Sequence, residues 1–164
     1  MAKFINSLTQ TRRNVMPGER RFAKRLESLL EDDYLCWFDI PIGPARDYPD
    51  FLILHPSRGL LVLEVKDWNL DTLHHIDKVS ADLKNDGGIK KVENPLEQAR
   101  RYMTNVVKLL GKDPQLCAES GPYQGKICFP YGHGVVLTNI TRKQLNSRLS
   151  EEEQSLVLPG HLVI

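Results

Sequence analysis

Apolar residues recur at helical spacing in two segments of the chain. Between Pro17 and Asp33, an apolar stripe predicts an amphipathic helix, and a proline suits its first turn. A second helix is predicted between Asn94 and Gly111, because Asn94-Pro95-Leu96-Glu97 offers an N-cap, a first-turn proline and a capping-box glutamate. The two apolar stripes consist of Phe22, Leu26, Leu29 and Leu30, and of Leu96, Ala99, Met103, Val106 and Leu110.

Between and after these helices, runs of β-branched, aromatic and aliphatic residues bounded by turn residues predict strands. The connection from His55 to Gly59 contains both proline and glycine and predicts a hairpin. The uninterrupted apolar run Leu60 to Leu63 is typical of a central strand covered on both faces. A second, more exposed hairpin is predicted around Asn85-Asp86-Gly87-Gly88. The expected strands are Tyr34 to Ile42, Asp50 to Leu54, Leu60 to Lys66 and Gly134 to Thr138.

The order helix, three strands, extra hairpin, helix, strand predicts an α/β (α+β) fold, with one central mixed sheet flanked by helices. A length of 164 residues favours a single main domain. We expect an N-terminal extension over residues 1–16, the folded domain over 17–140, and a C-terminal segment over 141–164 that leads into a further domain. Its polar part, from Thr141 to Gln154, is expected to be helical in part.

The amino-acid composition argues against several classes of protein. Hydrophobic residues make up 41% and charged residues 26% of the chain, as in ordinary globular proteins. The net charge of +1 means that any nucleic-acid surface must arise from local segregation of charge. Three cysteines without a CxxC pair favour a reducing compartment over a disulfide framework or a zinc site. No apolar run approaches the roughly 18 residues of a membrane span, so we expect a cytoplasmic protein without membrane contact.

Candidate chemistry concentrates on the first hairpin. If it is centred on Ser57, Asp50 lies directly opposite Glu64, and Lys66 shares their face because side chains alternate along a strand. Two opposed carboxylates repel each other unless a cation lies between them, and Mg²⁺ or Mn²⁺ prefers such oxygen ligands. A lysine beside the cation could position or deprotonate a water, which favours phosphodiester hydrolysis. The alternative is a surface ion pair of Glu64 and Lys66 with Asp50 capping a turn, which the apolar strands disfavour.

The first predicted helix carries a carboxylate on the wrong face. At 100° per residue, Glu19 falls inside the apolar stripe that should face the core. Directly after it, Arg20 and Arg21 begin a basic strip that continues to Lys24 and Arg25. This strip is either a DNA-contacting surface or an ordinary solvated helix face.

These residues resemble a known nuclease superfamily. Pro49-Asp50, thirteen intervening residues and Glu64-Val65-Lys66 are similar to the PD-(D/E)xK motif. Gly18-Glu19 upstream and Asn94-Pro95-Leu96-Glu97-Gln98 downstream narrow the resemblance to the nuclease-related, or NERD, domain. The resemblance implies a restriction-endonuclease-like core. It also implies that Asp50, Glu64 and the Val65 carbonyl bind the metal, that Lys66 is catalytic, and that Glu19 lies beside the metal.

Three further residues are candidates for contact with substrate. Gln98 and Tyr102 flank the apolar stripe of the second helix, and the superfamily's QxxxY motif implies that Gln98 lies near the phosphate and Tyr102 near the nucleotide. The alternative is that Tyr102 covers the sheet edge and Gln98 is solvated. Trp68, two residues after Lys66, could stack on a base, although a core role is commoner for an aromatic residue.

The resulting hypothesis is an Mg²⁺- or Mn²⁺-dependent deoxyribonuclease domain acting on single-stranded or duplex DNA. The resemblance is to NERD domains fused to helicase modules, which suggests a larger DNA-processing protein. Two alternatives remain open: a nucleic-acid binding module that keeps the fold but cuts poorly, and a regulatory domain for an attached helicase.

Overall fold

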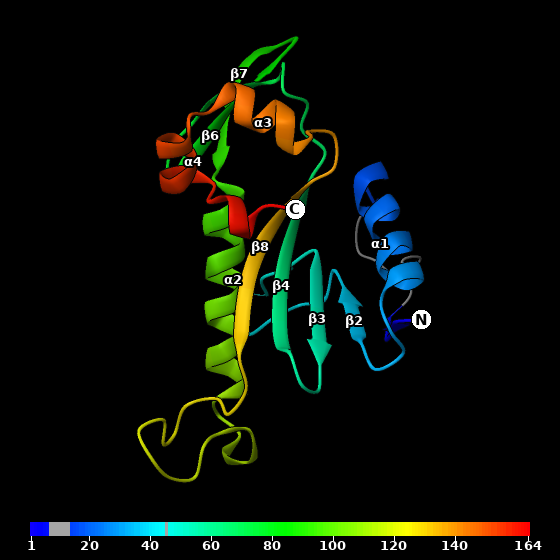
Figure 1. Ribbon diagram of the computed structural model, residues 1–164, viewed down its shortest axis with the longest axis vertical. Helices are drawn as coiled ribbons and strands as arrows, with labels where there is room; N and C mark the ends of the chain where they lie inside the picture. Colours follow the sequence, from blue (N-terminus) through cyan, green and yellow to red (C-terminus); the bar gives the residue numbers. More distant parts are fainter. Residues whose placement is uncertain (7–13, 45) are drawn as a thin grey trace.

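The computed structural model describes residues 1–6, 14–44 and 46–164, and a five-stranded mixed sheet forms its centre (Figure 1). Residues 7–13 of the expected N-terminal extension lie outside the described residues. The strand order is β1-β2-β3-β4-β8, with β1 parallel to β2, β8 parallel to β4, and the other two pairs antiparallel. The strands are β1 (Lys3–Phe4), β2 (Leu35–Phe38), β3 (Phe51–His55), β4 (Gly59–Lys66) and β8 (Tyr131–Leu137).

Helices α1 (Pro17–Leu29) and α2 (Pro95–Leu110) cover opposite faces of this sheet (Figure 1). Along β4, Leu63 and Val65 pack in the core under α1, whereas Leu60 and Val62 pack under α2. The alternation follows from the two-residue period of a strand. β4 is therefore covered on both faces, as predicted, and its even-numbered residues face α2.

A second layer lies beyond one end of the main sheet, at the top of Figure 1. Strands β5 (Leu73–Ile76), β6 (Ser80–Asn85) and β7 (Gly88–Glu93) form a three-stranded antiparallel sheet. It shares a core with helices α3 (Arg142–Arg148) and α4 (Glu151–Val157) and with the first turn of α2. Asn85 pairs with Gly88, which confirms the predicted second hairpin. Short 3₁₀ turns are η1 (Pro114–Leu116) and η2 (Gly160–Leu162).

The first helix and the strand after it are both shorter than predicted. α1 ends at Leu29 instead of Asp33, because Leu30 has an extended backbone with ψ 148°. Leu29 is 68% exposed, so its assignment to the core stripe was wrong. The strand expected to reach Ile42 ends at Phe38, because Asp39 adopts a left-handed conformation with φ 49° that no strand continues.

The limits of α2 are confirmed, and its cap is partly as predicted. The side chain of Asn94 accepts a hydrogen bond from the Leu96 amide at 2.9 Å. Glu97 forms no capping box in this structure and instead accepts from Arg100 Nε at 3.0 Å.

The last strand of the main sheet also differs from the prediction. β8 begins at Tyr131, three residues before Gly134, because parallel pairing with β4 extends over residues that carry no apolar signal. It ends at Leu137, one residue before the predicted Thr138. Within the described parts of the chain, no helix has the length and apolarity to cross a membrane.

Candidate active site

The first hairpin brings two carboxylates together at one end of the main sheet. Phe51 pairs with Leu63 and Leu52 with Val62, which is the predicted register. Asp50 directly precedes Phe51 and Glu64 directly follows Leu63, so the two residues stand opposite each other. Each is only 3% exposed. The amide of Val65 donates a hydrogen bond of 2.7 Å to Asp50 Oδ2.

A lysine and two α2 side chains continue the site on the same face. Lys66 Nζ donates to Glu64 Oε1 at 2.7 Å and to Gln98 Oε1 at 3.1 Å. Gln98 Nε2 in turn donates to the hydroxyl of Tyr102 at 3.1 Å. The expected alternation is thus correct, and one turn of α2 supplies the groups that orient the lysine.

Glu19 enters the site from α1, on the other side of the sheet. It lies in the first helical turn, is 3% exposed, and its Oε2 accepts a hydrogen bond from the Met16 amide at 2.9 Å. Its predicted inward orientation is confirmed. Glu19, Asp50, Glu64, Lys66, Gln98 and Tyr102 all line one cavity of about 630 Å³.

Electrostatics favour a cation in this cavity. Burial, followed by the negative charge of Glu64, raises the pKa of Asp50 to about 8. The Val65 amide and Lys66 oppose this rise, and Glu19 adds to it. Four buried acidic side chains, those of Glu19, Asp39, Asp50 and Glu64, thus line the same cavity as the cationic groups of Lys66 and Arg46. The donors are hard oxygens, which fits Mg²⁺ or Mn²⁺ better than a softer metal ion.

The structure brings some of the expected substrate-contacting residues to the cavity and leaves others outside it. Trp68 lines the cavity but also packs against the core of the smaller sheet. Tyr102 is only 9% exposed and belongs to the core beneath α2, with the Arg101 guanidinium 4.7 Å from its ring centre. Tyr102 therefore packs in the core as well as lining the cavity. Arg20 and Arg21 are exposed on α1 and are not among the described residues that line the cavity.

A family model for the nuclease-related domain, NERD, matches residues 15–130, which is more than half of the chain. The chain belongs to the NERD family. No curated protein and no solved structure matches it. Family membership confirms the resemblance and agrees with a nuclease-like core of mixed α+β architecture. The matched segment includes both arms of the hairpin and both α1 and α2.

The cavity of this NERD domain includes an acidic residue whose place in the site the sequence pattern did not predict. Asp39 is 7% exposed, lines the same cavity, and its amide donates to the carbonyl of Asp50 at 3.2 Å. Asp39 directly follows β2, whose last pair is Phe38 with Phe51, so Asp39 lies beside Asp50, which in turn lies opposite Glu64. The β2–β3 connection is too long for its turn to fix a register, so the pattern gave no signal for Asp39.

A second group of possible metal ligands lies at the opposite end of the hairpin of this NERD domain. One ligand atom from each of Glu31, Asp33 and His55 falls within 4.8 Å of the others. However, His55 Nδ1 accepts the amide proton of Ser57 at 3.1 Å. The ring proton must then sit on Nε2, which lies 2.9 Å from Asp33 and donates to it. In this arrangement His55 has no nitrogen lone pair available for a metal ion.

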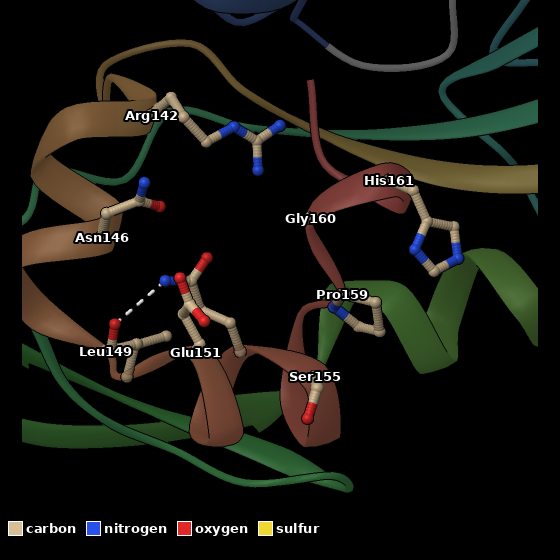
Figure 2. Close-up of a pocket in the computed structure, with 9 residues that line it drawn as sticks. Arg142, Asn146, Leu149, Glu151, Ser155, Pro159, Gly160 and His161 are labelled. Carbon is tan, nitrogen blue, oxygen red and sulfur yellow. Dashed lines mark hydrogen bonds between the residues drawn. The ribbon is translucent and has the colours of Figure 1, made fainter.

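Another cavity, of about 650 Å³, lies between α3, α4 and η2 (Figure 2). Its lining residues lie outside the segment that the family model matches. Two of its polar side chains are engaged with the backbone of the C-terminal segment. Gln154 Nε2 donates to the Leu149 carbonyl at 2.9 Å, and Arg142 donates to the Val163 carbonyl. These bonds hold the C-terminal segment against α3.

Proposed function

We propose that this NERD domain is a metal-dependent nuclease that hydrolyses DNA phosphodiester bonds. The observation that carries the proposal is the pair of opposed, buried carboxylates, Asp50 and Glu64, with Lys66 hydrogen-bonded beside them. Asp50, Glu64 and the Val65 carbonyl would hold Mg²⁺ or Mn²⁺, with Glu19 beside the ion. Such an ion would polarise the phosphodiester and lower the pKa of a bound water, so that hydroxide forms more readily near neutral pH.

The residues of the chain would divide the remaining work. Lys66 positions the attacking water or offsets the charge that develops on the phosphoryl oxygens, where a fixed ammonium is most effective in a partly buried site. Its side chain is 20% exposed, so it can meet substrate at the cavity surface. Gln98 holds the ammonium from α2, and Tyr102 holds Gln98.

We place the DNA along the cavity mouth. Trp68 is half-buried at the cavity and offers a surface on which a base could stack. Arg20 and Arg21 follow Glu19 directly on α1, so their basic strip starts at the helix end that enters the site. Resemblance to NERD domains fused to helicases supports a larger helicase-linked DNA-processing protein, with the domain spanning about residues 17–140.

A nuclease assay tests the proposal. Single-stranded and duplex DNA are incubated with the protein in Mg²⁺, Mn²⁺ or EDTA, for the wild type, Lys66→Ala and Lys112→Ala. Lys112 is an exposed lysine just past the far end of α2 and serves as the matched control. We expect metal-dependent cleavage that Lys66→Ala lowers by about 10²–10⁴-fold and Lys112→Ala leaves intact.

Two outcomes would contradict the proposal. Cleavage that continues in EDTA, or that is equal in the wild type and Lys66→Ala, would remove the metal-site mechanism. DNA binding without cleavage in either metal would favour the alternative, a nucleic-acid binding or regulatory module that retains the nuclease fold.

A further inference from the structure

We propose that Asp67 is a positioning residue that fixes the N-terminus of α1 and thereby holds Glu19 in the candidate metal site. This inference rests on the proposed function, since it assigns a task to Glu19. Asp67 directly follows Lys66 at the end of β4, and no sequence motif singled it out.

Asp67 joins three separate parts of the fold. Its Oδ2 accepts the Gly18 amide of α1 at 2.8 Å, and its Oδ1 accepts the hydroxyl of Thr138, just past β8. The Thr138 amide donates to the Lys66 carbonyl at 3.1 Å, so β8 and β4 are themselves tied together at this point. One carboxylate therefore connects α1 to the two strand ends beside the site.

The direction of Asp67 separates its role from that of the candidate ligands. Along β4, Glu64 and Lys66 face α2, whereas Val65 packs in the core under α1. Asp67 continues this alternation, so its carboxylate points to the α1 side of the sheet. Both of its oxygens already accept hydrogen bonds from other elements. Asp67 lines the same cavity as Asp50 and Glu64, but its two oxygens are engaged by the Gly18 amide and the Thr138 hydroxyl, so it is placed to hold α1.

The helix needs this external acceptor. The N-cap of α1 is Met16, which has no side-chain oxygen to accept the unpaired amide protons of the first turn. Asp67 supplies an oxygen and a negative charge at the helix N-terminus from 49 residues away. Glu19 accepts the Met16 amide in the same turn. The position of the Glu19 carboxylate and the anchoring of the helix are thus coupled through a single turn.

Gly18 shows how close the approach is. A Cβ atom on this residue would lie 1.5 Å from Asp67 Oδ1 and 2.4 Å from Thr138 Oγ1. Only a glycine lets the helix come this near to the strand ends. Since Glu19 is the next residue, any retreat of the helix would withdraw its carboxylate from Asp50 and Glu64.

The test measures Mn²⁺ affinity by calorimetric titration, together with the melting temperature in EDTA, for the wild type and four variants. These are Glu19→Ala, Asp67→Ala, the double variant, and Asp67→Asn. We expect Asp67→Ala to weaken Mn²⁺ binding by about 10–100-fold, as loss of a supporting group does at metal sites. The double variant should bind no more weakly than Glu19→Ala, because both changes remove the same contribution.

Asp67→Asn should bind Mn²⁺ like the wild type. Its amide keeps an oxygen for the Gly18 amide and gains an N–H for the Thr138 hydroxyl. Asp71→Ala is the matched control, since it removes an exposed carboxylate four residues further along the chain. It should leave Mn²⁺ affinity unchanged.

Several results would overturn the inference. One is an Asp67→Ala protein that melts earlier in EDTA yet binds Mn²⁺ like the wild type, which would make Asp67 a purely structural residue. Another is additive loss in the double variant. Wild-type Mn²⁺ affinity in Glu19→Ala would also overturn it, because Glu19 would then contribute nothing to metal binding for Asp67 to support.

If Asp67→Ala does not fold, Thr138→Val carries the test. It should weaken Mn²⁺ binding in the wild-type background and have no effect in Glu19→Ala, and unchanged affinity in both backgrounds would overturn the inference. A wild-type protein that neither binds Mn²⁺ nor cleaves DNA contradicts the proposed function instead, so the two failures are distinguishable.

Discussion

At the scale of single residues, Asp50 makes the stability of the metal-free protein depend on pH. Burial and the charge of Glu64 raise its pKa from 3.8 to about 8. Between these values the unfolded chain releases a proton that the folded protein keeps, so the free energy of unfolding falls as pH rises from about 4 to 8.

We predict that Asp50→Asn flattens this part of the pH profile. Its side-chain oxygen can still accept the Val65 amide, but the carboxylate charge is gone. At pH 9 in EDTA the variant should be more stable than the wild type by at least about 1.4 kcal/mol, the equivalent of one pKa unit. Urea denaturation from pH 4 to 9 measures the difference, and parallel profiles for the two proteins would contradict the prediction.

Gln98 and Tyr102 should respond differently to truncation. Gln98 is half-buried at the cavity, so Gln98→Ala should lower turnover while changing stability by no more than about 0.5 kcal/mol. Tyr102 belongs to the core, so Tyr102→Ala should destabilise the fold by about 3 kcal/mol. Tyr102→Phe keeps the ring and is the control. DNA cleavage rates and urea denaturation distinguish the effects, and a fully stable Tyr102→Ala protein would contradict this assignment.

At the scale of elements, the start of α2 connects the two sheets. Asn94 is 1% exposed, and its side-chain oxygen accepts a hydrogen bond from the Leu96 amide. Its side-chain nitrogen donates to the carbonyls of Asp77 at 2.8 Å and Val157 at 3.0 Å. The N-cap therefore ties the helix that carries Gln98 to the β5–β6 turn and to the end of α4.

We predict that Asn94→Ala destabilises the protein by about 2–4 kcal/mol, since it removes a cap and leaves buried carbonyls without their donor. Thr141→Ala is the matched comparison, because Thr141 caps α3 at an exposed position and its loss should cost about 1 kcal/mol. Chemical denaturation measures both, and equal effects would show that the two buried bonds contribute little.

At the scale of the whole molecule, a metal that binds only the folded state should raise the melting temperature. The stabilisation is about 2.7 kcal/mol when the free Mg²⁺ or Mn²⁺ concentration is a hundred times Kd. We predict that Asp50→Ala abolishes this shift. Asp33→Ala, at the Glu31, Asp33 and His55 group, should leave it intact, because both nitrogens of His55 are already engaged by Ser57 and Asp33. Loss of the shift in Asp33→Ala alone would place the metal at that group.

The sequence by itself determined those parts of the site that depend on local geometry. A short turn from His55 to Gly59 leaves one register for the hairpin, and the strand period of two then puts Asp50, Glu64 and Lys66 on one face. The helical period likewise placed Glu19 inward. Turn length, strand period and helical period each depend on only a few neighbouring residues, so they can be recognised in the sequence.

Only the tertiary structure decided the contacts that join distant segments. Asp39 stands opposite Asp50 across a connection whose length fixes no register, and Asp67 meets Gly18 from 49 residues away. The exposure of Leu29 and the burial of Tyr102 depend on which faces other elements cover. The pattern along one element shows which side chains share a face, but packing between elements decides what that face meets.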